Sequence, residues 1–168
     1  MNENHHVILI GYMGAGKSTV GLELARKLNR EYIDLDTEIV LSEKKQIPAI
    51  FEELGEPYFR AAEAQVLRAV KGEKVISTGG GVLYFQDTGR WMKKNGTVIY
   101  LNAPFEELYE RIAGDGNRPL VMNNTAASLE QVFYQRDIVY REAADLIVSV
   151  SECSVEDTLD EIIVKLTT

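Results

Sequence analysis

Apolar residues along the chain fall into short, nearly continuous runs separated by longer segments with helical spacing. The runs predict five strands, which lie at residues 7–10, 32–36, 74–77, 97–101 and 146–150. Between them, helical periodicity or helix-capping residues predict helices at residues 18–29, 37–42, 47–55, 57–70, 86–94, 104–112, 129–144 and 154–166. Short, mostly apolar strands that alternate with helices are typical of a parallel sheet with both faces covered.

This alternation predicts an α/β fold with three layers, in which a five-stranded parallel sheet carries helices on both faces. The chain has 168 residues and shows no internal repeat, low-complexity tract or linker. We therefore expect one domain over residues 1–168.

A glycine-rich motif follows the first predicted strand and opens the first predicted helix. Residues 11–18 read Gly-Tyr-Met-Gly-Ala-Gly-Lys-Ser, which fits the phosphate-binding loop (P-loop) pattern G-x-x-x-x-G-K-[ST]. Its backbone N–H groups, the helix N-terminus and Lys17 suit nucleotide phosphates, and the Ser18 hydroxyl suits Mg²⁺. The simpler alternative is a glycine-rich turn with a solvated lysine. The predicted ATP contacts are Gly14, Ala15, Gly16, Lys17, Ser18 and Thr19.

Two other strand ends carry unusual residues. Asp34 and Asp36 end the second predicted strand, and three glycines, Gly79, Gly80 and Gly81, follow the third. The carboxyl ends of parallel strands form the ligand-binding edge of such a sheet. In an extended segment both aspartates would point to one side, one toward Mg²⁺ and the other toward an acceptor hydroxyl. The alternatives are that the aspartates cap the next helix and that the glycines form only a flexible turn.

Several arginines are candidates for contacts with anions. Arg118 lies in a Gly/Asn-rich segment at about 112–125, which we expect to be a mobile lid that brings Arg118 over the phosphates. Considered alone, Arg60, with Glu63 three residues later, indicates a surface ion pair. The same interpretation applies to Arg136.

Composition excludes some classes of function. The formal net charge is −8 and the pI is about 4.9, which argues against nucleic-acid binding. No apolar run approaches the roughly 20 residues that span a bilayer. Cys153, the single cysteine, suits a reducing compartment and an inert role. His5 and His6 are expected in a solvated terminus, and we expect a cytoplasmic monomer that binds neither nucleic acid nor membranes.

Taken together, the motifs resemble those of shikimate kinases, a P-loop family related to the nucleoside-monophosphate kinases. The resemblance extends over about residues 7–166. It rests on the ordered set of the P-loop at 11–19, Asp34-Leu35-Asp36, Ile50-Phe51 through Gly55-Glu56, Phe59-Arg60-x-x-Glu63, Ser77-Thr78-Gly79-Gly80-Gly81, Arg118-Pro119-Leu120 and Arg136-x-x-x-Tyr140.

The resemblance implies transfer of the ATP γ-phosphate to the 3-hydroxyl of shikimate, a step in aromatic amino-acid biosynthesis. It implies catalytic roles for Asp36 at the acceptor hydroxyl and for Lys17 and Arg118 at the phosphates. It also implies Mg²⁺, bound directly by Ser18, with Asp34 and Ser77 in its outer shell.

On the acceptor side, the resemblance implies that Arg60 and Arg136 hold the substrate carboxylate and that Glu63 orients Arg60. Backbone groups of Gly79, Gly80 and Gly81 would contact the substrate.

This sequence departs from the family pattern in two places. Val121 stands where we expect a second leucine in the lid, and residues 151–154 lack an arginine that stacks on adenine in some members. Arg111 is then the candidate that packs on the base. The alternatives are another small-molecule or nucleotide kinase, such as a gluconate or nucleoside-monophosphate kinase, and a non-catalytic ATP-binding module.

Overall fold

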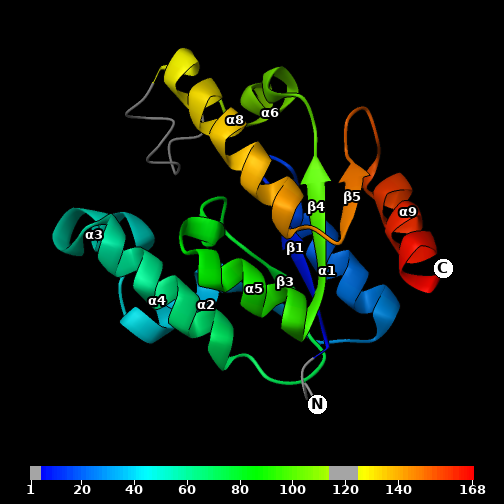
Figure 1. Ribbon diagram of the computed structural model, residues 1–168, viewed down its shortest axis with the longest axis horizontal. Coiled ribbons are helices and arrows are strands. Elements are labelled where there is room, and N and C mark those ends of the chain that lie inside the picture. Colours follow the sequence, from blue (N-terminus) through cyan, green and yellow to red (C-terminus); the bar gives the residue numbers. More distant parts are fainter. Residues whose placement is uncertain (1–4, 114–124) are drawn as a thin grey trace.

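A five-stranded parallel sheet forms the centre of the protein in the computed structural model, which describes residues 5–113 and 125–168 (Figure 1). Its order is β2-β3-β1-β4-β5, and every neighbouring pair is parallel. The strands are β1 (His6–Ile10), β2 (Tyr32–Asp34), β3 (Val75–Ser77), β4 (Gly96–Asn102) and β5 (Leu146–Ser149). The predicted fold class is confirmed.

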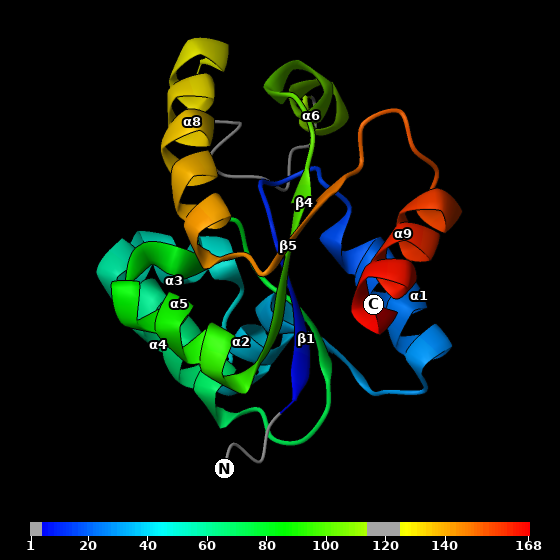
Figure 2. The same cartoon turned by 45° about the vertical axis from the view of Figure 1, so that its right-hand side comes forward.

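Helices cover both faces of this sheet. They are α1 (Lys17–Leu28), α2 (Leu35–Glu43), α3 (Ile47–Leu54), α4 (Glu56–Ala69), η1 (Val82–Tyr84), α5 (Gln86–Asn95), α6 (Phe105–Ile112), α8 (Ala126–Ala143) and α9 (Val155–Thr167). Figure 2 shows α1 and α9 on one side of the sheet and α5 and α8 on the other. No helix within the described parts of the chain is long and apolar enough to cross a membrane.

The topology fixes where a ligand can bind. Strand β1 is buried along its whole length and lies between β3 and β4. The chain leaves β1 through α1 on one face, whereas it leaves β3 toward α5 on the other face. Adjacent strands whose connections run to opposite faces open a crevice at their carboxyl ends. The loops that meet at this crevice are the P-loop and the three glycines after β3.

The second predicted strand is shorter than expected. Strand β2 ends at Asp34, whose carboxylate accepts a hydrogen bond from the Thr37 backbone N–H at 3.2 Å and caps α2. An aspartate cap satisfies a free N–H of the first helical turn. Because the helix begins at Leu35, Asp34 and Asp36 do not alternate along one extended segment. The expectation that extended geometry aligns them was wrong, and the capping alternative is correct for Asp34.

His6 is also placed differently from the expected solvated terminus. Its side chain is fully buried in β1, and its ring stacks on Trp91 with centroids 6.2 Å apart. Nδ1 accepts the Lys74 backbone N–H at 3.2 Å, while Nε2 lies 3.3 Å from the Val70 carbonyl oxygen. These partners select the neutral tautomer that is protonated at Nε2. Burial lowers the pKa of His6.

This environment predicts a pH-dependent contribution to stability. The pKa of His6 is lower in the folded state than in the unfolded state. His6 therefore stabilises the fold at pH values above its unfolded-state pKa, and this stabilisation is lost as the pH falls through the folded-state pKa. Protonation at Nδ1 would also break the bond from Lys74. Thermal unfolding of the wild type and of His6→Asn between pH 7.5 and 5.5 should show a smaller acid-induced loss in the variant. His5→Gln, which changes an exposed neighbour, is the control. Equal slopes for wild type and His6→Asn would contradict this account.

Candidate functional site

The P-loop encloses its own lysine. Gly14 and Gly16 adopt left-handed backbone conformations with φ of 86° and 87°, which glycine permits without steric cost. Gly16 immediately precedes α1, so the loop ends at that helix N-terminus. The Lys17 ammonium donates to the carbonyl oxygens of Gly11 at 2.5 Å and Tyr12 at 3.1 Å. The loop therefore combines a buried cation with a helix N-terminus, which is the arrangement that favours phosphate.

Helix α6 packs directly on this loop. A Cβ atom added at Gly14 would lie 2.9 Å from Cγ2 of Ile112 and 3.1 Å from the Leu108 carbonyl oxygen. Arg111 donates through Nη1 to the Gly14 carbonyl oxygen at 3.0 Å, and its Nη2 lies 2.9 Å from Oε1 of Glu107. Arg111 thus lies against the phosphate loop, and its packing on adenine stays a prediction.

Oxygen ligands suited to Mg²⁺ gather where the P-loop enters α1. The Ser18 hydroxyl lies 3.3 Å from Oδ2 of Asp34, the residue that ends β2. The neighbouring Ser77 hydroxyl is buried and donates to the Lys17 carbonyl oxygen at 2.7 Å. Mg²⁺ prefers hard oxygen ligands and is often held by one or two protein groups together with substrate phosphates. The Ser18 and Asp34 oxygens fit that requirement. No cluster of three or more His, Cys, Asp and Glu side chains suited to a metal occurs among the described residues.

Arg60 and Glu63 form a buried ion pair. Arg60 is 6% exposed and Glu63 is 1% exposed, and Nη1 of Arg60 lies 3.0 Å from Oε1 of Glu63. Burial, which outweighs the attraction of Arg60, raises the pKa of Glu63 to about 7. The interpretation of this pair as a surface feature was wrong, because α4 turns it inward toward the glycine turn. The Arg60 guanidinium also lies over the Phe59 ring, 5.0 Å from its centroid.

The first glycine of the turn, Gly79, lies beside two carboxylates. A Cβ atom added there would lie 3.2 Å from Oε2 of Glu63 and 3.4 Å from Oδ1 of Asp36. Asp36 is exposed in the first turn of α2. Although the extended geometry was wrong, Asp36 therefore still lies next to the glycine turn.

The other two glycines lie beside two guanidinium groups. A Cβ atom at Gly80 would lie 3.1 Å from Nη1 of Arg136 and 3.7 Å from the backbone nitrogen of Met13 in the P-loop. One at Gly81 would lie 2.6 Å from Cζ of Arg60. A side chain at Gly81 would need the Arg60 guanidinium to shift, and one at Gly80 would need Arg136 to give by a few tenths of an ångström. The glycine turn is thus the wall shared by the P-loop and the two arginines.

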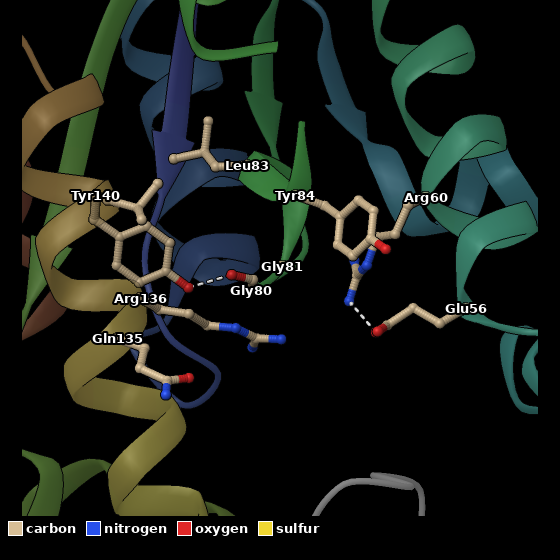
Figure 3. A pocket seen from close by; sticks show the side chains of 10 residues that line it. Glu56, Arg60, Gly80, Gly81, Leu83, Tyr84, Gln135, Arg136 and Tyr140 are labelled. Carbon is tan, nitrogen blue, oxygen red and sulfur yellow. Dashed lines mark hydrogen bonds and ion pairs between the residues drawn. The ribbon is translucent and has the colours of Figure 1, made fainter. Parts of the chain in front are cut away.

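A cavity of about 230 Å³ lies in front of this wall. Figure 3 shows Arg60 and Arg136 entering it from opposite sides, with Tyr84 at the rim beside Arg60. Its lining residues are Glu56, Arg60, Gly80, Gly81, Leu83, Tyr84, Gln135, Arg136, Val139 and Tyr140. Two guanidinium groups facing one small cavity favour a planar anion such as a carboxylate.

Part of the predicted site lies outside the described residues. Arg118 and most of the predicted lid belong to residues 114–124, which the structure does not describe. Cys153 is exposed.

Sequence reasoning missed the pocket contribution of Tyr140, which is buried and donates a hydrogen bond to the Gly80 carbonyl oxygen. Its i, i+4 spacing from Arg136 puts both residues on one face of α8, a signal that was available. The spacing alone could not show that this face meets the glycine turn.

The fold and the site define a P-loop kinase that acts on a small molecule. The family model described as shikimate kinase matches residues 13–167. The chain is 41% identical over 160 residues to the shikimate kinase of Persephonella marina, covering 94% of this chain and 96% of the relative. It also superposes on shikimate kinase from Acinetobacter baumannii in complex with shikimate, with a TM-score of 0.91, 36% identity and coverage of 98% and 93%. The chain belongs to the shikimate kinase family.

A rival kinase is a more distant match. A gluconokinase from Sinorhizobium meliloti superposes with a TM-score of 0.59 at 17% identity and covers 99% of this chain and 94% of that one. This likeness shows a shared fold.

The packing at Gly81 yields a direct prediction. In Gly81→Ala, the new methyl group would occupy space held by the Arg60 guanidinium, so the KM for the acidic acceptor should rise at least tenfold. The KM for ATP should change little, because the P-loop is not displaced. Steady-state ADP release measures both constants. Gly89→Ala is the control, because its Cβ would make ordinary contact at 3.5 Å with Cδ2 of Leu83. An unchanged acceptor KM in Gly81→Ala would contradict the assignment of this wall.

Proposed function

We propose that this protein transfers the γ-phosphate of ATP to the 3-hydroxyl of shikimate and releases ADP. The observation that carries the proposal is the pair of guanidinium groups, Arg60 and Arg136, facing one small cavity whose glycine wall also borders the P-loop. The proposal includes the monomeric state and the cytoplasmic location expected from the sequence.

The acceptor carboxylate binds between the two arginines. A guanidinium group offers parallel N–H donors that match a planar carboxylate, and two of them offset the repulsion expected from a protein of net charge −8. Glu63 holds Arg60 in place, and the N–H groups of Gly79 to Gly81 face the substrate. Leu83 and Val139 supply an apolar wall for the ring.

At the other end of the site, the P-loop binds the triphosphate. The backbone of residues 14–19 and the Lys17 ammonium surround the phosphate oxygens, and Arg111 supports the loop from α6. Arg118 is proposed to approach the phosphates from the lid. When bound, Mg²⁺ neutralises phosphate charge during transfer, and Ser18 would hold it with Asp34 and Ser77 in the outer shell.

Asp36 orients the acceptor hydroxyl. Its carboxylate lies at the edge of the glycine turn, where Oδ1 would be 3.4 Å from a Cβ atom added at Gly79. During transfer the hydroxyl oxygen forms a bond to the γ-phosphorus, the bond from that phosphorus to the bridging oxygen breaks, and ADP departs. The proton of the hydroxyl passes to the Asp36 carboxylate.

A coupled assay of ADP release tests the function. Shikimate should support turnover, while gluconate, AMP and CMP should not. Turnover with gluconate or a nucleotide instead of shikimate would identify another kinase on the same fold. Tight ATP binding without ADP release from any hydroxylated acid would identify an ATP-binding module. Either result would overturn the proposal.

The role of Asp36 predicts a specific kinetic defect. Asp36→Asn should abolish turnover, because the amide cannot accept the hydroxyl proton, while ATP affinity stays nearly intact. Calorimetry with ATP and the coupled assay measure the two properties. Glu38→Gln removes another acid from the first turn of α2 and serves as the control. If Asp36→Asn kept most of its activity, the assignment of the proton acceptor would be wrong.

The two arginines predict a defect in acceptor binding. Arg60→Ala or Arg136→Ala should mainly raise the KM for shikimate, with a smaller loss in kcat if the bound acceptor is poorly oriented. The matched control is Arg141→Ala on α8, since Arg141 pairs with Asp137 at 3.0 Å instead of lining the cavity. An equal rise in KM for Arg141→Ala would show that helix charge, and not the cavity position, causes the effect.

A further inference from the structure

Tyr140 places a hydroxyl group behind the glycine wall of the cavity. Its side chain is 1% exposed, and the hydroxyl donates to the Gly80 carbonyl oxygen. Figure 3 shows this bond next to the extended side chain of Arg136. Burial raises the pKa of Tyr140, so the hydroxyl stays a donor at any physiological pH. None of the roles assigned above uses this group.

The bond restricts the orientation of one peptide unit. The Gly80 carbonyl and the Gly81 N–H belong to the same planar trans peptide and point in opposite directions. Fixing the carbonyl against α8 therefore turns the N–H away from that helix. Gly80 and Gly81 both have large backbone conformational freedom. The hydrogen bond from Tyr140 therefore strongly affects which orientation of their shared peptide is populated. Within residues 5–113 and 125–168, the N–H groups of Gly80 and Gly81 have no protein acceptor.

The same helix turn links this peptide to Arg136. Tyr140 and Arg136 are four residues apart on α8 and share one face. An added Cβ at Gly80 would lie 3.6 Å from the Tyr140 hydroxyl and 3.1 Å from Nη1 of Arg136. The Tyr140 hydroxyl and the Arg136 guanidinium therefore lie beside the same glycine.

Tyr140 is itself held by the sheet. Its ring lies 5.0 Å, centroid to centroid, from that of Tyr100 on β4. The Tyr100 hydroxyl donates to Oδ1 of Asp137 on α8 at 2.6 Å. Both tyrosines donate a hydrogen bond, Tyr100 to a carboxylate of α8 and Tyr140 to a backbone carbonyl of the glycine turn, and of these two bonds only that of Tyr140 reaches the cavity wall.

We propose that Tyr140 is a positioning residue for acceptor binding, in which its hydroxyl aligns the Gly80–Gly81 peptide with Arg136 so that both grip the acceptor carboxylate. This inference rests on the proposed function. Under this proposal, the orientation of the Gly80–Gly81 peptide helps to recognise the acceptor carboxylate. Tyr140 sets that orientation and does not need to contact the substrate.

Tyr140→Phe removes this hydroxyl and keeps the ring. The KM for shikimate should rise about tenfold, the effect of losing roughly one well-placed hydrogen bond, and the KM for ATP should stay within twofold. Tyr100→Phe is the matched control, because it removes a buried hydroxyl from the same ring pair. Its KM for shikimate should stay within twofold of the wild type.

A second measurement distinguishes a specific effect on carboxylate recognition from a general loss of ligand binding. Shikimate and its methyl ester, which lacks the carboxylate charge, are compared as ligands by calorimetry. The preference of the wild type for the acid over the ester should fall about tenfold in Tyr140→Phe and stay unchanged in Tyr100→Phe. Thermal unfolding of Tyr140→Phe and Tyr100→Phe shows whether the two variants are equally stable, so that a fall in acid preference confined to Tyr140→Phe cannot be attributed to instability.

The outcomes distinguish the inference from the function on which it rests. Absence of shikimate-dependent ADP release in the wild type would overturn the proposed function. With an active wild type, three results would overturn the role of Tyr140. They are an unchanged KM for shikimate, an equal weakening of acid and ester, and a Tyr100→Phe variant that matches Tyr140→Phe.

Discussion

The site depends on the close packing of the glycine turn after β3. A Cβ at Gly81 would lie 2.6 Å from the Arg60 guanidinium carbon and one at Gly80 would lie 3.1 Å from Arg136, so a side chain at either position would have to move an arginine. The bare backbone lets two cations and the P-loop approach one wall. In the proposed function, that proximity brings an anionic acceptor next to the phosphates, as phosphoryl transfer requires.

Electrostatics explains why the arginines must be held rigidly. The chain carries a net charge of −8, yet the guanidinium groups of Arg60 and Arg136 both face the cavity. Burying Arg60 is costly unless it is paired, and Glu63 provides that pairing from the next turn of α4. The Glu63 pKa of about 7 shows that burial of this carboxylate is itself unfavourable. Burying the Arg60–Glu63 pair is therefore energetically unfavourable, but the pair holds the Arg60 guanidinium in a fixed position.

Local patterns predicted most of the fold and part of the site. The P-loop and the parallel sheet follow from short-range residue spacing. Burial depends on tertiary packing, which explains the errors. Spacing predicted the ion-pair partner of Arg60 but not its burial against the glycine turn, and it could not show that His6 packs against Trp91. For Asp34, capping of α2 outweighed the continuation of a short strand.

A crystal structure of the protein with shikimate, Mg²⁺, ADP and a planar phosphate analogue would test the shared wall most directly. The account predicts the carboxylate between Arg60 and Arg136, in contact with the Gly80–Gly81 backbone. The 3-hydroxyl should face both Asp36 and the phosphate analogue. A shikimate molecule bound in another cavity, or in the reverse orientation with its carboxylate toward Lys17, would contradict the account.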